Sequence, residues 1–375
     1  MDNSHSNRLK SFDVLKGFII FAIVMLHLIY TNHSTYGHPA LYLQILFIGL
    51  MSFFIMSGYF YRPNKGFIKN IGSRSKQLII ATAICTIVLS AILFVWLFVF
   101  GNSSNLDDYI LSMKWGFGVH NAFGTYTDGK IYPLCGAEVG YYFLWAMMVA
   151  FLIFYGLADY VMDSKWKSLA VVIVLLVITF VWAEFVRIRL PFFADLAPMG
   201  AALMFAGAWL AKLDIGGIIE GFEYRTKKFW LPFLICLVCG LALMVVFNPD
   251  TNFDTMVFGY YGGYSAFPYF IEAVCMVVVY LYIALFVSKI PLLGTTLSFI
   301  GKHTLGLLLL HGFVAKMLII PFWTVTNASW FPTDMVFTER VVIGLATVII
   351  CLLICHFGPI VVQKIRDKRA ESSTD

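Results

Sequence analysis

The sequence predicts an all-α integral membrane protein with about ten transmembrane helices and both termini in the cytoplasm. Its composition supports this class, because 60% of the 375 residues are hydrophobic and only 13% are charged. A soluble domain has about 25% charged residues. The chain also contains ten separate apolar stretches. Each is long enough to cross a hydrocarbon core about 30 Å thick, which takes about 20 residues.

The ten predicted spans use almost the whole chain. Short segments with Gly, Asn or Pro separate most of them. We therefore expect a single transmembrane domain over residues 1–375, with short cytoplasmic tails at about 1–12 and 364–375. The predicted spans are 13–32, 40–61, 77–101, 139–160, 167–186, 192–211, 229–247, 268–288, 294–320 and 340–363.

The distribution of basic residues predicts the orientation. With the N-terminus in the cytoplasm, most of the 26 Lys and Arg residues fall in the cytoplasmic segments, including the loop from Arg62 to Lys76 and the tail after residue 363. Cytoplasmic loops of membrane proteins have this excess of Lys and Arg. An even number of spans then brings both termini to the cytoplasmic side. Low cysteine usage and compact loops suit a multi-pass protein of a bacterial cytoplasmic membrane.

Two other function classes find no support in the sequence. The net charge of +5 comes from short groups beside the predicted spans and not from a basic patch, so we expect no nucleic-acid partner. Cys236 and Cys239 form a CxxC, but the motif lies within an apolar stretch, without a second pair or nearby histidines. Such a pattern does not predict a metal site.

The first apolar stretch, SFDVLKGFIIFAIVMLHLIY, contains three ionisable residues: Asp13, Lys16 and His27. On a helix of about 100° per residue, Lys16 and His27 lie only about 20° apart in azimuth, and Asp13 lies about 40° from His27. The imidazole is then roughly 16 Å deeper in the membrane than the ammonium. Ionisable groups inside a bilayer face protein or water and are candidates for function. His27 is a suitable proton acceptor near neutral pH.

A purely structural interpretation of these three residues is also open. Asp13 is able to cap the helix, Lys16 to extend to the headgroups, and His27 to be a buried, hydrogen-bonded histidine. For Asp13 alone we favour this interpretation. The alignment of all three on one face favours function.

Several later residues are further candidates. The second span contains Ser57-Gly58, where a small pair allows another backbone to approach closely. Arg74 and Lys76 precede the third span in the most basic cytoplasmic loop, and could bind phosphates or merely follow the topology rule. Glu138 and Tyr142 lie at the outer start of the fourth span, where an acid orients a substrate or caps a helix.

His311 is the second deeply placed histidine, in the ninth span. It belongs either to a two-histidine site with His27 or, as we slightly favour from sequence alone, to the packing of that helix against a neighbour.

Taken together, these motifs resemble acyltransferase family 3, whose members are ten-helix membrane acyltransferases that modify exported glycans and other envelope molecules. The first span, FDVLKGFIIFAIVMLH, is similar to the family's LDxLRG phrase with its Arg-x10-His pair. Phe53 to Tyr59 resembles FFxxSGY, and Ile300 to His311 resembles IGKxSLxxYLLH. The resemblance extends through nearly the whole chain.

The resemblance implies a membrane O-acyltransferase that transfers an acyl group from cytoplasmic acyl-CoA, with acetyl-CoA favoured, to a hydroxyl of an envelope glycan or lipid-linked sugar. His27 then acts as general base or carries the acyl group transiently, while Asp13 and Lys16 stabilise charge. Lys16, Arg74 and Lys76 are the residues expected to bind the CoA phosphates, with Glu138, Tyr142, Ser57 and His311 in substrate or supporting roles and no metal involved.

Two residues depart from the family pattern. Lys16 replaces the usual arginine and lacks its planar fork of donors. Gln77 stands where a second arginine of an Arg-x-x-Arg pair is usual, although Lys76 offers a substitute charge. Two other functions remain open: a transporter or flippase that uses the polar face as a translocation path, and an inactive relative that acts as an assembly partner. Binding of acyl-CoA discriminates between the enzyme and the transporter.

Overall fold

The protein is helical throughout the part of the chain that the structure describes. This computed structural model describes residues 10–29, 49–63, 66–99, 109–110, 113–114, 116–119, 123, 141–215, 227–247, 266–322 and 335–371. No strand occurs in these ranges. The all-α class predicted from the sequence is confirmed for them.

The helices follow the apolar stretches of the sequence. Most are α-helices, and four short segments have 3₁₀ or π geometry. In chain order they are α1 (Lys10–Ile29), η1 (Gly49–Met51), α3 (Ser52–Tyr59), α4 (Phe67–Ser75), η2 (Lys76–Ile80), α5 (Ala81–Val99), α7 (Tyr141–Val161), α8 (Lys165–Val181), η3 (Trp182–Val186), η4 (Pro191–Leu196), α9 (Ala197–Lys212), α11 (Lys227–Phe247), α13 (Ala266–Ser288), α14 (Pro291–Lys302), α15 (Thr304–Ile319) and α16 (Phe337–Glu371).

Seven helical runs among the described residues are long and apolar enough to cross a membrane, and the bent pair α14–α15 brings the number to as many as eight. α1 is not among the seven, and the second predicted span is described only from Gly49, as a short apolar helix to Tyr59. The protein is therefore a multi-pass membrane protein. The total of ten spans and the cytoplasmic termini stay predictions.

Exposure of apolar side chains separates the helices that face lipid from those that form the core. In the helical run Pro191–Lys212, which includes α9, 78% of the residues in the apolar segment are buried inside the protein. The corresponding share is 17% in α11 and 22% in α16. Residues such as Val238, Ile349 and Leu353 are large, apolar and exposed on these outer helices. A soluble protein covers such surfaces, whereas the acyl chains of a bilayer solvate them.

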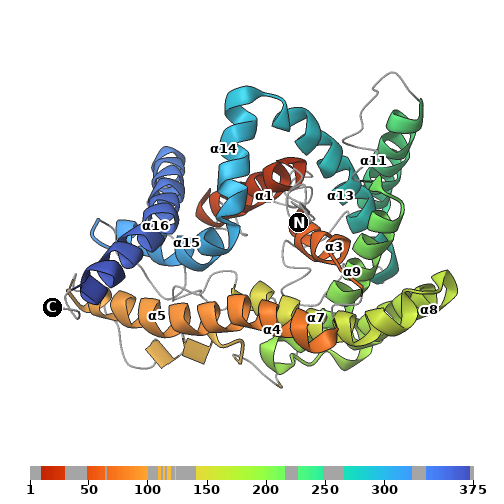
Figure 1. Cartoon of the computed structure of the whole chain (residues 1–375), viewed down its shortest axis with the longest axis horizontal. Helices are drawn as coiled ribbons and strands as arrows, with labels where there is room; N and C mark the ends of the chain where they lie inside the picture. The colour runs from red at the N-terminus through yellow and green to blue at the C-terminus, as the bar shows by residue number, and fades with distance from the viewer. Residues whose placement is uncertain are drawn as a thin grey trace.

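The central element is α1. It packs against α3, α13, α14, α15 and α16, and Figure 1 shows it and α3 surrounded by the other helices. Phe12, Val14, Ile20 and Val24 are buried on this helix. An ionisable side chain on α1 therefore faces protein in most directions.

Glycines allow two close helix crossings in the core. A Cβ on Gly17 of α1 would overlap the Leu297 carbonyl oxygen of α14, and one on Gly301 would overlap the Asp13 carbonyl oxygen. α3 and α9 cross in the same way, where a Cβ on Gly58 would overlap the Met204 carbonyl oxygen. The close approach predicted at Ser57-Gly58 is thus confirmed for Gly58. Small residues serve this purpose in membrane helix pairs.

The ninth predicted span, 294–320, is not one straight helix. α14 and α15 meet at 81°, with His303 as the non-helical residue between them. Side chains form hydrogen bonds with the backbone carbonyl groups that the break leaves without helical partners. His303 Nδ1 lies 2.9 Å from the Phe299 oxygen, and Thr304 Oγ1 donates to the Gly301 oxygen at 2.8 Å. Apolar periodicity does not reveal this break, because both arms are apolar and the polar residues Lys302 to Thr304 interrupt them only briefly.

The third predicted span, 77–101, also begins earlier than expected. Its helical run starts at Phe67, where α4 follows Gly66, a residue with φ of +75°. A glycine adopts this conformation without steric cost, so the chain turns there into the helix. Arg74 consequently lies within the run and does not open it. The run contains a π-helical turn from Lys76 to Ile80, a feature common at functional sites.

Candidate functional site

The polar face of α1 begins with an ion pair. Lys16 Nζ lies 3.0 Å from Asp13 Oδ1, with 26% of the lysine side chain and 3% of the aspartate side chain exposed. The two residues are three apart on the helix, a spacing that brings side chains together. Each charge is thereby partly compensated in a poorly solvated position.

His27 and His311 form a pair at the other end of α1. Their ring centroids are 5.4 Å apart and their planes are inclined by 47°. His27 is half-buried, and His311 is fully buried on α15. The two deep histidines that the sequence places in different spans therefore lie side by side. The two-histidine geometry is present, while its catalytic role stays a prediction.

Backbone groups hold the ring of His311 in place. Its Nδ1 lies 3.0 Å from the carbonyl oxygens of both Leu307 and Leu308. The hydroxyl of Tyr141 on α7 donates to the Leu309 oxygen at 2.6 Å, so it ties α7 to the same turn of α15. Tyr142 is the tyrosine that the sequence predicts for a substrate or supporting role. Its neighbour Tyr141, fully buried, is the tyrosine that reaches the histidine helix, and only tertiary packing distinguishes the two.

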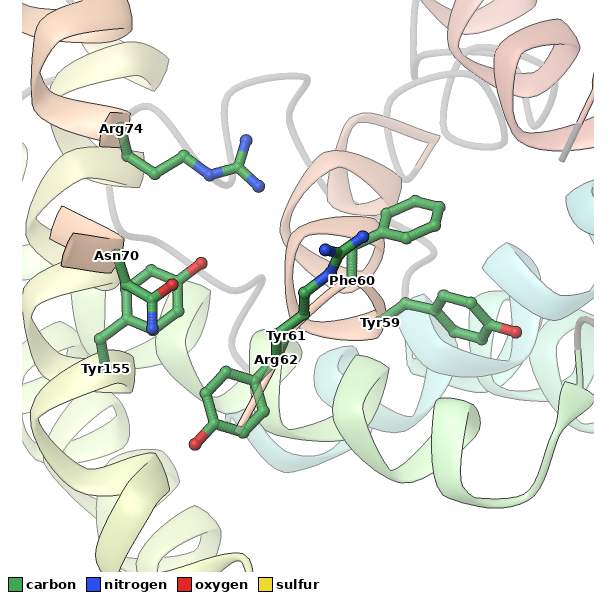
Figure 2. A pocket seen from close by; sticks show the side chains of 7 residues that line it. All are labelled: Tyr59, Phe60, Tyr61, Arg62, Asn70, Arg74 and Tyr155. Carbon is green, nitrogen blue, oxygen red and sulfur yellow. The ribbon is translucent and has the colours of Figure 1, made fainter. Parts of the chain in front are cut away.

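A basic, aromatic pocket lies at the end of α3. Its volume is about 550 Å³, and it is lined by Tyr59, Phe60, Tyr61, Arg62, Asn70, Arg74 and Tyr155. Figure 2 shows the side chains of α4 and α7 on one side of this pocket and, on the other, those of the end of α3 and the segment that follows it. Two guanidinium groups in one cavity favour an anionic ligand with several acceptor oxygens.

Several contacts fix the shape of this pocket. Arg74 lies 5.6 Å from the ring centroid of Phe151, and the hydroxyl of Tyr61 donates a short hydrogen bond to Asp159. The buried side-chain nitrogen of Asn70 has no hydrogen-bond partner among the described residues. It is a donor available to a ligand.

The pocket adjoins the start of α1. The ring of Phe12 lies 4.9 Å from that of Tyr59 and 5.2 Å from that of Phe60, centroid to centroid. From Phe12 to His27 is about 22 Å along the helix axis at 1.5 Å per residue. A ligand with a charged head in the pocket needs a long arm to reach the histidines.

The remaining predicted site residues have varied positions. Ser57 Oγ donates to the Phe53 oxygen within α3, and Tyr142 packs against Phe193, with ring centroids 5.6 Å apart. Lys76 lies in η2, and its side chain is outside the described residues, as is the whole of Glu138. Lys16 pairs with Asp13 and is not among the residues that line the pocket.

Six of the seven residues that line the pocket are not among the site residues predicted from the sequence. Asn70 and Tyr155 come from segments with no recognisable motif, and Arg62 was one cation among many in the basic loop. Arg74 alone was selected and lines the pocket. In the described part of the chain, no group of three or more His, Cys, Asp or Glu side chains has the arrangement of a metal site.

Comparison with protein families agrees with this geometry. The model of the acyltransferase domain of acyltransferase family 3 matches residues 9–356, nearly the whole chain. The chain belongs to acyltransferase family 3. No curated protein and no solved structure matches it. The resemblance noted from the motifs of the sequence is thus confirmed, and both the His27–His311 pair and the basic pocket lie within the part that matches acyltransferase family 3.

Proposed function

We propose that this protein is a membrane-bound O-acyltransferase, which transfers an acyl group from cytoplasmic acyl-CoA to a hydroxyl of an envelope or exported glycan. Membership of the family supports acyl transfer. The observation that carries the proposal is the course of α1: it begins beside the basic pocket and brings His27 against His311 at its other end. We place the protein in a cytoplasmic membrane.

The pocket suits the phosphate-bearing head of acyl-CoA. Arg62 and Arg74 supply forked donors for phosphate oxygens, Asn70 offers a buried N–H, and Tyr59 and Tyr155 provide rings for stacking against a base. Lys76, two residues after Arg74 in the chain, is a further cation that we propose for this role. Acetyl-CoA is the favoured donor, as the sequence resemblance implies, and its flexible arm would have to extend about 22 Å along α1 to reach His27.

His27 is the group that activates the acceptor. As a general base it takes the proton of the hydroxyl while the hydroxyl oxygen attacks the thioester carbonyl carbon. The carbon–sulfur bond breaks, and the departing sulfur receives the proton from His27. In the alternative order, His27 itself attacks the thioester and then passes the acyl group to the hydroxyl. Both orders release CoA with a free thiol.

Asp13 and Lys16 stabilise the start of the same helix. Their ion pair keeps a buried carboxylate compensated and leaves a cation on the polar face between the pocket and the histidines. The acceptor is a sugar hydroxyl of an envelope glycan or a lipid-linked sugar, in keeping with the substrates that the sequence resemblance implies.

Binding of acetyl-CoA to the detergent-purified protein, measured by calorimetry, tests the donor. We expect specific binding that weakens at least about tenfold in Arg74→Ala, as loss of a charged hydrogen bond does. The control is Lys165→Ala, which removes an exposed cation outside the pocket. It should bind as the wild type does. A folded protein that binds neither acetyl-CoA nor longer acyl-CoAs would contradict the proposal and favour the transporter.

A further inference from the structure

The imidazole ring of His311 has a buried nitrogen, Nε2, that the packing of the described helices leaves unpaired. It has no hydrogen-bond partner among the described residues, and the whole side chain is 0% exposed. An unpaired buried nitrogen costs free energy, so native proteins seldom keep one without a use. The side chain nearest in kind is the imidazole of His27, 5.4 Å away between ring centroids.

The position of the proton on His311 follows from its contacts. Nδ1 lies 3.0 Å from two carbonyl oxygens, which only accept hydrogen bonds. Nδ1 therefore carries the hydrogen and donates to Leu307 and Leu308. In the neutral ring the other nitrogen, Nε2, then holds a lone pair and can only accept. The fold thus presents a hydrogen-bond acceptor, fixed in direction, beside His27.

We propose that His311 is a positioning residue for acyl transfer, whose Nε2 accepts a hydrogen bond from His27 and so selects the His27 tautomer. This role rests on the proposed function of His27 as general base. A neutral imidazole has one N–H and one lone pair, and only the tautomer whose N–H points to His311 leaves the lone pair for the acceptor hydroxyl. Catalytic hydrogen bonds of this kind are often long before substrate binds.

The proton balance of the step is simple. The hydroxyl proton moves to the nitrogen of His27 that faces the acceptor, as the oxygen bonds to the thioester carbon. The hydrogen on the other His27 nitrogen stays there and keeps its bond to His311 Nε2. When the carbon–sulfur bond breaks, the sulfur takes the proton that His27 received. His311 neither gains nor loses a proton.

Two substitutions separate this role from simple packing. In His311→Asn the shorter amide reaches the position of Nδ1 and still donates to the backbone, but no acceptor remains at the position of Nε2. In His311→Gln the longer side chain brings its amide oxygen close to the Nε2 position. Asn therefore keeps the donor to the backbone and lacks the acceptor for His27, whereas Gln keeps the acceptor and loses that donor, so activity that follows the acceptor separates the two roles.

Steady-state transfer from acetyl-CoA gives the first test. We expect His311→Asn to lower kcat by about 10²-fold, within the range for loss of general acid–base catalysis, with KM for acetyl-CoA little changed. His311→Gln should recover at least about tenfold of that loss. The inference is overturned if Asn is as active as the wild type, or if Asn and Gln are equally inactive, which is the pattern of a packing role. Absence of transfer by the wild type would contradict the proposed function instead.

A spectroscopic measurement tests the pair without any activity. In ¹⁵N NMR of the histidine-labelled protein, His311 should show a protonated Nδ1 and an unprotonated Nε2, and the His27 signals should shift in His311→Asn. His356→Asn is the matched control, because it removes an exposed histidine of α16, and it should leave the His27 signals in place. A protonated Nε2 in His311, or His27 signals that do not respond to His311→Asn, would refute the inference.

Discussion

At the scale of single residues, Asn70 has an energetic cost in the free protein and a proposed role in binding the donor. Its side-chain nitrogen is buried in the wall of the pocket and has no partner in the described part of the chain. We predict that Asn70→Leu raises the thermal stability of the detergent-purified protein, because it removes an unpaired donor and leucine is the better helix former.

The same Asn70→Leu variant should bind acetyl-CoA more weakly. On one preparation, thermal unfolding should therefore show a higher unfolding temperature, and calorimetry a lower affinity for acetyl-CoA. A variant that gains stability and keeps full affinity would show that the Asn70 nitrogen does not contact the ligand.

Lys16 allows a second prediction at this scale. Lys16→Met leaves the carboxylate of Asp13, 3% exposed, without its lysine partner. We expect a loss of about 1–3 kcal/mol in unfolding free energy, reduced by the partial exposure of the lysine. Lys16→Arg keeps the charge and restores the residue usual in the family, so it should unfold like the wild type. Equal stability of the Met variant would mean that the ion pair contributes nothing measurable.

At the scale of elements, the crossing of α3 and α9 is a strict steric constraint. A Cβ on Gly58 meets the backbone of Met204, which cannot rotate away as a side chain can. Gly58→Ala should therefore force the helices apart and cost about 1–3 kcal/mol or more. Reduced yield of folded protein and a lower unfolding temperature are the readouts.

Gly72→Ala is the matched control for this crossing. Gly72 lies in the exposed part of α4, where an added Cβ meets nothing within 4 Å. Alanine there should be neutral or stabilise the helix by up to about 1 kcal/mol. If both variants behave alike, the close approach of α3 and α9 is not what makes Gly58 necessary.

Particular elements show how far the sequence predicts this fold. The first span, its polar face and the small residue at the α3 crossing are predictable, because apolar length, helical periodicity and Gly are local signals. The bend at His303 is not, since Lys302 to Thr304 interrupt the apolar run only briefly and the side chains of His303 and Thr304 satisfy the freed carbonyls. Likewise, the early start at Phe67 follows from one glycine turn outside the apolar stretch.

At the scale of the whole molecule, packing of the helices brings together site residues that are far apart in the sequence. His27 and His311 are each predictable as deep histidines, but their contact depends on how α1 sits within the other helices. The pocket draws on α3, α4 and α7, and its residues Asn70 and Tyr155 have no motif of their own. Contacts between distant segments therefore account for most of the site that sequence reasoning did not predict.

The central proposal is that His27 catalyses the transfer of an acyl group from acyl-CoA supplied on the cytoplasmic side. Its most direct test uses membrane vesicles containing the protein and acetyl-CoA labelled in the acetyl group, with label counted in the glycan and lipid fractions. The account predicts transfer by the wild type and, with His27→Ala at equal abundance, a loss of about 10²–10⁴-fold, the contribution expected of a general base. Substantial transfer by the His27→Ala protein would contradict it.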